Sequence, residues 1–266
     1  MSEADAIERV DEPGTVDSLA ADLRALGVAA GDTLLVHSSL SSLGWVAGGP
    51  QAVVDALRTV LTDDGTLVMP THTGQYTDPS AWENPPVPDD WVEVIGESMP
   101  PFRPDVTPTR GMGAVPECFR NYPGVVRSEH PTVSFAAWGA AAEEIVTGHE
   151  LDYGLGDGSP LARVYGRGGD VLLLGVGHGN NTSLHLAEHR ADFEKERTTE
   201  RAPLLRDGER VVVEYDDIEV ETDDFEEVGE AFERAVGATE GAVAAATLLD
   251  QPALVDFAED WFESNR

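Results

Sequence analysis

The stretch Gly175–Arg190, GVGHGNNTSLHLAEHR, is the part of the chain from which the fold and a site can be inferred together. It follows the apolar run Val171–Leu174, which predicts a buried parallel strand. Glycines and asparagines then predict a turn, and Asn180–Ser183 are N-cap residue types that open a helix. In open α/β sheets, ligands bind in the crevice at the carboxyl ends of the strands. The stretch therefore predicts an α/β fold with a site at this strand end.

The predicted helix carries His185, Glu188 and His189 on one face, because positions i, i+3 and i+4 are neighbours on a helix. An imidazole supported by a carboxylate can accept a proton near neutral pH, so we expect His185 to be a general base. Its carboxylate could be Glu188, or Glu214 at the polar end of the predicted strand 210–215. By residue type alone, a solvated face is the better interpretation of Glu214 in a chain with so many acids. Two histidines without a third ligand are weak evidence for a metal site, and we expect no metal.

The charge of the chain excludes several classes of partner. The 266 residues include 17 Lys and Arg against 50 Asp and Glu, a formal net charge of −33, with Lys195 as the single lysine. Carboxylates spread along the whole chain indicate adaptation to high salt, although they could also attract cationic ligands. No basic stripe is present to bind nucleic acid. We expect no membrane span and, with Cys118 as the single cysteine and no signal-peptide pattern, a cytoplasmic protein.

The periodicity along the chain predicts one three-layer α/β domain over residues 1–266, with helices on both faces of a mostly parallel sheet. We expect residues 1–14 to be a flexible arm, and antiparallel strands near residues 204–220. The proline-rich stretch 71–110 predicts a functional loop or lid. The other elements expected from the sequence are strands at 33–37, 66–69, 134–138 and 171–174 and helices at 16–26, 50–61, 111–120, 140–147, 223–236, 240–249 and 254–264.

Other polar residues could carry chemistry near the strand ends. The small-residue loop Ser38–Gly49 offers hydroxyls and backbone N–H groups suited to phosphate, or it is an ordinary strand–helix connection. His130 precedes a proline and could be structural, and His72 follows a strand end. A Ser–His–acid hydrolase is disfavoured because the chain lacks a G-x-S-x-G nucleophile elbow.

Taken together, many short stretches resemble the aminoglycoside N3-acetyltransferase, or antibiotic N-acetyltransferase, family. The resemblance runs from about Leu19 to Asp224 and does not extend to the Gcn5-type acetyltransferase fold. The stretches that carry it are Val36–Gly44, Gly48-Gly49, Met69–His72, Thr107–Gly113, Glu117 with Phe119-Arg120, Arg127-Ser128, His130-Pro131, Ser134–Gly139, Ser159–Leu161 and Asn181–Glu188.

The resemblance implies acetyl transfer from acetyl-CoA to a primary amine, without a covalent intermediate. It implies His185 as the base with an acid near position 214 as its partner. It also implies that the Ser-rich loop and the Gly-Met-Gly segment hold CoA. The expected catalytic residues are His185, Glu214, Glu188 and His130; the expected cofactor-binding residues are His37, Ser38, Ser39, Leu40, Ser41, Arg110, Met112 and Gly113; the expected substrate-binding residues are His72, Asn181 and Asp152.

The acceptor expected from the resemblance is an aminoglycoside-like molecule or another polyamine, which a carboxylate-rich pocket would bind, and the expected role is antibiotic resistance. A homodimer is compatible with the sequence. The alternative is a non-catalytic protein of the same fold that binds CoA or a polyamine. The presence of His185, His130 and Glu214 favours the enzyme.

Overall fold

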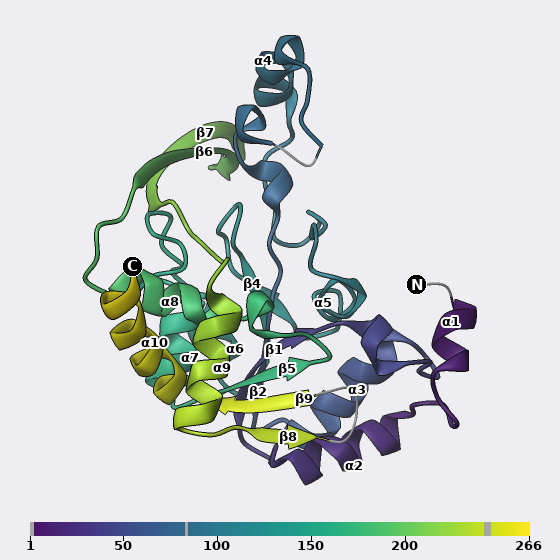
Figure 1. Ribbon diagram of the computed structural model, residues 1–266. Helices are drawn as coiled ribbons and strands as arrows, with labels where there is room; N and C mark the ends of the chain where they lie inside the picture. Colours follow the sequence, from purple (N-terminus) through teal and green to yellow (C-terminus); the bar gives the residue numbers. More distant parts are fainter. Residues whose placement is uncertain (1–2, 83–84, 242–245) are drawn as a thin grey trace.

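The computed structural model describes residues 3–82, 85–241 and 246–266. Within these residues, a seven-stranded sheet has the order β3-β4-β2-β1-β5-β9-β8 (Figure 1). The bounds of its strands are β1 Thr33–Ser38, β2 Thr66–Pro70, β3 Val126–Arg127, β4 Phe135–Gly139, β5 Asp170–Leu174, β8 Thr239–Gly241 and β9 Ala246–Asp250.

The centre of the sheet is parallel, because β1 pairs in parallel with both β2 and β5. On one side β4 and β3 follow in antiparallel pairing, and on the other side β9 and β8 do the same. Two successive antiparallel pairings restore the original direction, so only β4 and β9 run against the other described strands. The expected α/β class with a mostly parallel sheet and added antiparallel strands is confirmed.

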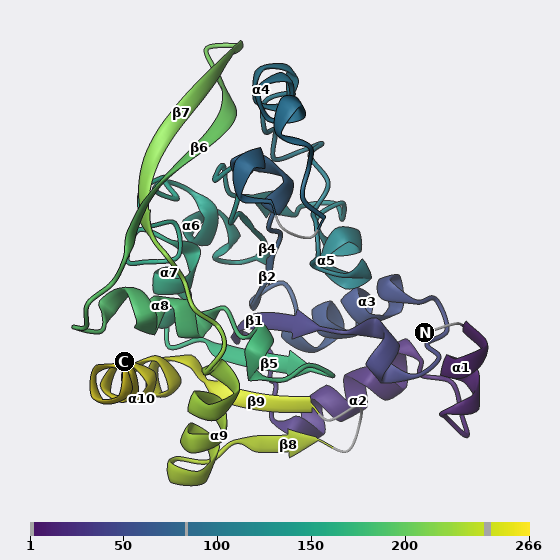
Figure 2. The ribbon, with the colours of Figure 1, turned by 45° about the horizontal axis from the view of Figure 1, so that its top comes forward.

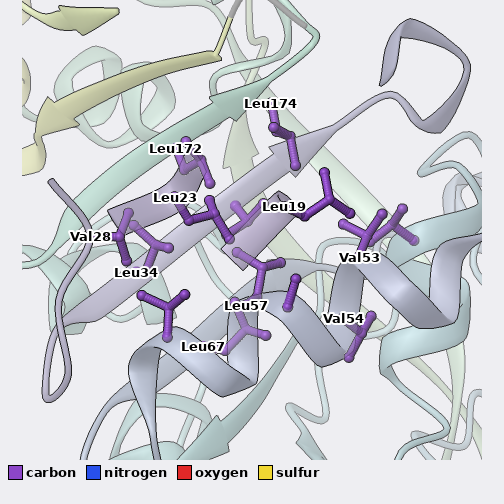
Figure 3. Close-up of a cluster of buried hydrophobic side chains, with 14 of the residues drawn as sticks. Leu19, Leu23, Val28, Leu34, Val53, Val54, Leu57, Leu67, Leu172 and Leu174 are labelled. Atoms are coloured by element: carbon purple, nitrogen blue, oxygen red, sulfur yellow. The ribbon is translucent and has the colours of Figure 1, made fainter. Parts of the chain in front are cut away.

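Alternate residues of each central strand supply two separate hydrophobic cores, as expected for a sheet covered on both faces. In β1, Leu34 and Val36 face one core and Leu35 faces the other. Leu34, Leu172 and Leu174 pack against leucines and valines of two helices, among them Leu23 and Val53 (Figure 3). The predicted three layers follow directly from this alternation.

The helices that cover the first face begin and end where the sequence predicts. In α2, Val16–Leu26, the side chains of Thr15 and Ser18 form a capping box, and Gly27 closes the helix in the left-handed conformation. In α3, Pro50–Leu61, proline occupies the first turn, where its missing N–H costs nothing. A third helix on this face, α5, spans Ala114–Phe119.

The second face is covered by the helices of the later part of the chain (Figure 1). They are α6 Ala142–Val146, α7 Pro160–Gly166, α8 Ser183–Arg190, α9 Phe225–Ala235 and α10 Gln251–Asn265. Helix α8 follows β5 through the Gly/Asn turn that the sequence predicts, which includes the short 3-10 helix His178–Asn180. None of the helices in the described part of the chain is long and apolar enough to cross a membrane.

Two segments rise away from the main sheet. The antiparallel strands β6, Arg197–Arg206, and β7, Glu209–Ile218, form a separate ribbon. The stretch 71–110, expected to be irregular, contains two short 3-10 helices and α4, Asp89–Ser98. Figures 1 and 2 show the ribbon and α4 rising side by side. Their ends meet, because Arg210 donates to the carbonyls of Gly96 and Met99 and the N–H of Phe102 donates to Pro203.

One local expectation is wrong. The helix predicted at 240–249 is replaced by β8 and β9, because Ala246–Asp250 pairs with β5 and tertiary pairing overrides helix propensity; residues 242–245 of that prediction lie outside the described residues. The predicted flexible arm contains helix α1, Glu3–Glu8, and Gly14 pairs with Val46. Residues 1 and 2 of the arm, and 83 and 84 of the predicted lid, also lie outside the described residues.

Candidate active site

The carboxyl ends of β1 and β5 lie next to each other and are joined at their tips. His37 pairs with Leu173 in the sheet, and the N–H of Ser39 donates to the carbonyl of Leu174, 3.0 Å away. The chain leaves β1 through the Ser-rich loop and leaves β5 through the Gly/Asn turn. The two loops predicted to carry chemistry therefore meet at one edge of the sheet, as the parallel arrangement requires.

A cleft of ≈ 820 Å³ opens at this edge, which we call the Ser38 cleft. Hydroxyls, glycines and backbone groups dominate its wall, and the Oγ of Ser38 is buried there without a hydrogen-bond partner among the described residues. A backbone-rich wall of this kind suits a phosphorylated ligand. Its lining consists of Ala6, Ser38, Ser39, Leu40, Ser41, Gly44, Trp45, Val46, Gly49, Gly111, Met112, Gly113, Ala114, Gly175, Val176 and Asn180.

Six of the eight residues expected to bind the cofactor line this cleft, and two do not. Arg110 is exposed and its guanidinium lies over the ring of Trp82. His37 is buried one residue before the cleft, with Nε2 3.4 Å from Oγ1 of Thr182. Ala6 and Trp45 also line the cleft, and neither residue is singled out by the sequence pattern. The turn from Gly175 to Asn180 forms another wall of the cleft, at the strand end where the sequence predicts a site.

Glu117 fixes the Gly-Met-Gly side of the Ser38 cleft. Its Oε2 accepts hydrogen bonds from the N–H and the hydroxyl of Thr109, at 2.9 and 2.8 Å, and its carboxylate pairs with Arg120 at 2.5 Å. Burial would raise the pKa of Glu117, but the bonds from Arg120 and Thr109 outweigh it and lower that pKa to about 2. The carboxylate therefore stays ionised and holds the residues that lead into Met112.

His185 and Glu188 form a pair on the first turns of α8. Nδ1 of His185 lies 2.9 Å from Oε2 of Glu188, and the imidazole ring packs against Phe225 with centroids 4.8 Å apart. An ionised carboxylate only accepts, so the proton of the neutral imidazole lies on Nδ1 and the lone pair on Nε2. Nε2 has no hydrogen-bond partner among the described residues and is not one of the fully buried unpartnered atoms. The ring is 9% exposed and offers Nε2 as its free end.

The carboxylate of Glu188 is 1% exposed, yet it is fully satisfied. Besides His185, it accepts from the N–H of Glu221 at 2.9 Å and from Nη1 of Arg266 at 2.5 Å. Burial alone would raise the pKa of Glu188, but the hydrogen bonds from His185, Glu221 and Arg266 hold it below its ordinary value. Glu188 is therefore a buried, ionised partner for the imidazole.

The prediction that Glu214 supports His185 is wrong. Glu214 lies on the outer face of the ribbon, opposite Arg201 in the register, and pairs with its Nε at 3.3 Å. Its side chain is 66% exposed. Strand alternation explains the difference, since Val213 and Tyr215 occupy the buried face of β7 and Glu214 must point away. Glu188, the competing candidate on the same helix, takes the position.

The prediction that His130 is catalytic is also wrong, because both of its ring nitrogens are used inside the protein. Nδ1 accepts from the N–H groups of Thr132 and Val133, and Nε2 donates to the carbonyl of Leu151 at 3.1 Å. The residue is 0% exposed, and burial lowers its pKa to about 4. His130 is therefore a neutral structural histidine that joins its own loop to the backbone at Leu151.

Two further histidines stand near His185 and are held neutral. Burial, followed by the nearby charge of His185, lowers the pKa of both His37 and His72 to about 3. Nε2 of His72 is buried without a partner among the described residues, and its ring edge meets Phe135. His72 thus keeps an unused buried nitrogen, and its contact with the substrate stays a prediction.

The other two expected substrate residues differ. Asn181 is buried at the start of α8, where its Oδ1 accepts from the N–H of Ser183 and its Nδ2 lacks a partner among the described residues. Asp152 instead lines a second cleft of ≈ 850 Å³ around His189, Tyr153 and Lys195. There its carboxylate accepts from the N–H of Asp216, which ties it to β7.

Carboxylates that sequence reasoning did not single out lie on the inner side of the ribbon. Glu200 is opposite Tyr215, whose hydroxyl lies 3.1 Å from Oγ1 of Thr132 in the main body. Burial raises the pKa of Glu200, and the charges of Asp217, Asp78 and Glu219 raise it further. Asp78 lies in the predicted lid segment, Glu219 follows β7, and Asp217 also lies 3.1 Å from Nε2 of His189 on α8. In so acidic a sequence, only the three-dimensional clustering distinguishes them.

Arg127 fastens the predicted lid to the sheet. Its guanidinium donates to the carbonyls of Thr71, at 2.6 Å, and Thr107, also at 2.6 Å, and its Nε donates to Ser134. Burial lowers the pKa of Arg127 to about 10, so it remains charged. Both ends of the lid segment are therefore tied to one half-buried cation.

Comparison with known proteins identifies the relatives of this chain. The sequence profile of the family described as Aminoglycoside 3-N-acetyltransferase matches residues 35–263. The SPbeta prophage-derived aminoglycoside N(3')-acetyltransferase-like protein YokD of Bacillus subtilis is 46% identical over 97% of this chain and 96% of its own length. Aminoglycoside N(3)-acetyltransferase VIII of Streptomyces fradiae is 41% identical over 82% of this chain and 76% of its own length.

Solved structures match closely. The crystal structure of YokD superposes with a TM-score of 0.96 and covers 98% of each chain at 44% identity. AAC-IIIb in a binary complex with CoASH gives a TM-score of 0.85 at 32% identity, over 95% of this chain and 97% of that one. AAC-VIa bound to sisomicin gives 0.86 at 32% identity, over 96% and 99%. The chain belongs to the aminoglycoside 3-N-acetyltransferase family and is an acyltransferase of that type.

Proposed function

We propose that this enzyme transfers the acetyl group of acetyl-CoA directly to a primary amine of an aminoglycoside-like or polyamine acceptor, with His185 as general base and Glu188 as its orienting carboxylate. One observation carries the proposal: Nδ1 of His185 is bonded to Glu188, which leaves Nε2 free, on the helix that follows the turn lining the Ser38 cleft. His37 connects the His185–Glu188 pair with the cleft, because the charge of His185 acts on His37 and His37 directly precedes Ser38.

The Ser38 cleft fits CoA by its composition. Its wall offers an unpartnered hydroxyl from Ser38 and a backbone approach at Gly113, whose φ of +87° excludes ordinary side chains. The relative solved with CoASH supports this assignment. When bound, acetyl-CoA supplies an activated acetyl thioester. Arg110 and His37 remain candidate contacts at the edges of the cleft.

The proton chemistry follows from the hydrogen bonds. A protonated amine has no lone pair with which to attack a thioester carbonyl. Nε2 of His185 takes a proton from the amine as its nitrogen attacks the thioester carbonyl, and Glu188 stabilises the imidazolium that results. The C–S bond then breaks, the acetyl group stays on the amine, and CoA leaves as its thiol with the proton that the imidazolium returns. Because the carboxylate fixes the proton on Nδ1, the ring meets the acceptor with a lone pair at all pH values where the imidazole is neutral.

The acceptor would be held by negative charge. Glu200 lies within the field of Asp217 and Asp78, and these carboxylates can pair with ammonium groups of a polycation. AAC-VIa, a relative of the same fold, is known bound to sisomicin. Asn181 and His72 each add an unpartnered buried nitrogen nearer to His185.

The test is to supply purified protein with acetyl-CoA and a panel of aminoglycosides, linear polyamines and simple amines, and to follow release of the CoA thiol. We expect turnover with polycationic amines and its loss by at least about a hundredfold in His185→Ala. CoA binding, measured by calorimetry, should persist in that variant. Specific CoA binding with no thiol release from any amine would instead favour the non-catalytic alternative.

A further inference from the structure

We propose that Arg266 is a positioning residue that holds Glu188, and through it sets both the orientation and the proton affinity of His185. The inference rests on the proposed role of His185 as the base. Arg266 follows α10 and lies far from the histidine in the sequence, but its guanidinium reaches the carboxylate that His185 uses.

The guanidinium of Arg266 is itself held by several contacts. Nε and Nη2 form a two-pronged pair with the carboxylate of Asp224, at 2.8 and 2.5 Å, and Nη2 also donates to the carbonyl of Glu221 at 3.0 Å. The face of the guanidinium lies 4.1 Å from the ring centroid of Phe262. The side chain is 9% exposed. A cation held this rigidly can fix its remaining partner, Glu188.

Both carboxylate oxygens of Glu188 are therefore hydrogen-bonded. Oε1 accepts from Arg266 and from the N–H of Glu221, while Oε2 is left for Nδ1 of His185. The residues that grip it come from the turn before α9 and from the end of α10, and neither segment lines the Ser38 cleft. Arg266 therefore acts through Glu188 and not through a substrate.

The charge of Arg266 has a second consequence. A positive charge beside an imidazole–carboxylate pair lowers the affinity of that pair for a proton, whichever member holds it. Without the positive charge of Arg266, the full negative charge of Glu188 should act on His185, so that the imidazole binds a proton more readily. The charged or titratable groups around the pair are Arg266 and Asp224 from the α9–α10 side, Lys195 from the segment after α8, His37 from β1 and His72 from the lid segment.

The experiment compares Arg266→Met and Arg266→Lys with the matched control Arg234→Met. Arg234 is an exposed arginine that pairs with Glu230 on α9 and does not touch Glu188. For Arg266→Met we expect kcat/KM to fall at least about tenfold and the acidic limb of its pH profile to move up by about 0.5–1 pH unit, with the KM for acetyl-CoA within about twofold.

Arg266→Lys keeps the charge, but its three donors sit on one nitrogen and cannot reproduce the four hydrogen bonds that spread over the guanidinium. We expect kcat/KM to fall about threefold or more while the acidic limb stays in place. This variant also decides the matter if Arg266→Met does not fold. Wild-type kcat/KM and pH profile in the folded variants would overturn the proposal, as would an equal loss in the Arg234→Met control.

A measurement independent of turnover separates this inference from the proposed function. The ring 15N shifts of His185, followed by NMR across pH, report which nitrogen holds the proton. In Arg266→Met the midpoint should move up by about 0.5–1 pH unit relative to the parent. If the parent protein is inactive but the shift is seen, the proposed acetyl transfer is refuted and the proposed role of Arg266 stands. If the parent is active and the shift is absent, the proposed role of Arg266 is refuted.

Discussion

Nδ1 of His185 lies 2.9 Å from Oε2 of Glu188, and this contact within one helix replaces the distant acid that the sequence suggested. The spacing i, i+3 places the two side chains on one face of α8. Burial of Glu188 among three donors then makes the carboxylate a better partner than any exposed acid could be.

The first prediction compares the two acids. Glu188→Gln keeps the size of the side chain but presents a neutral amide to the imidazole, so that Nδ1 is no longer held protonated. We expect kcat to fall at least about tenfold, because the wrong tautomer then faces the acceptor. Glu214→Gln should stay within about twofold of the parent, since Glu214 pairs only with exposed Arg201. Equal losses in both variants would contradict the assignment.

A second prediction concerns the wall of the Ser38 cleft. Leucine in place of Ser38 or Ser39 would fill space that a phosphorylated ligand needs and remove backbone-directed hydroxyls. We expect calorimetry to report CoA binding at least about tenfold weaker in both variants, which is the effect of losing one or two good contacts. Thr59→Leu, an exposed hydroxyl on α3, is the control. Unchanged CoA affinity in the serine variants would refute the assignment of this cleft to CoA.

The third prediction tests the anchor of the Gly-Met-Gly segment. Glu117→Gln weakens the bonds to Arg120 and Thr109, so the segment that leads into Met112 should lose order. We expect the KM for acetyl-CoA to rise about three- to tenfold with kcat within about twofold. Glu144→Gln, which loses only an exposed pair with Arg167, should leave both constants unchanged.

Because the pKa of Glu117 is lowered to about 2, its anchoring contribution should hold above the ordinary carboxyl range and be lost only as the pH falls toward 2. The effect of Glu117→Gln on KM should therefore be the same at pH 6 and pH 8. A KM difference that disappears between these values would point to another titrating group.

The fourth prediction concerns stability at the other end of the strands, where Asp170 begins β5. Burial, then the charges of Asp32 and Asp250, raise the pKa of Asp170 to about 6. The folded protein therefore keeps a proton that the unfolded chain has lost between about pH 4 and 6, so stability falls as the pH rises through this window. Asp170→Asn removes this penalty above pH 6 and changes nothing below pH 4.

After a discount for the partial solvent exposure of Asp170, we expect a gain of about 1 kcal/mol at pH 7.5. For a chain of this size, that raises Tm by roughly 2–4 °C. Calorimetric scans at pH 4 and pH 7.5 check the difference, with Asp63→Asn in an exposed turn as the control. A variant less stable than the parent at pH 7.5 would show that the carboxylate is favourable where it stands.

Local sequence determined the elements and where they end. Thr15, Gly27 and Pro50 are capping residues whose preferences are satisfied within a single turn, so α2 and α3 begin and end as predicted. The alternation in β1 likewise set its two buried faces. The loop after β1 and the turn after β5 were recognisable as a site because parallel strands bring their carboxyl ends together.

Tertiary structure decided the partners. Whether Glu188 or Glu214 meets His185 depends on which face of β7 packs against the body, and a chain with 50 acids cannot show this in its composition. The same holds for Ala246–Asp250, which becomes a strand because β5 offers an open edge. Arg266 had no local pattern at all: only the packing of α10 against α8 brings its charge to the buried carboxylate, where desolvation makes a partner necessary.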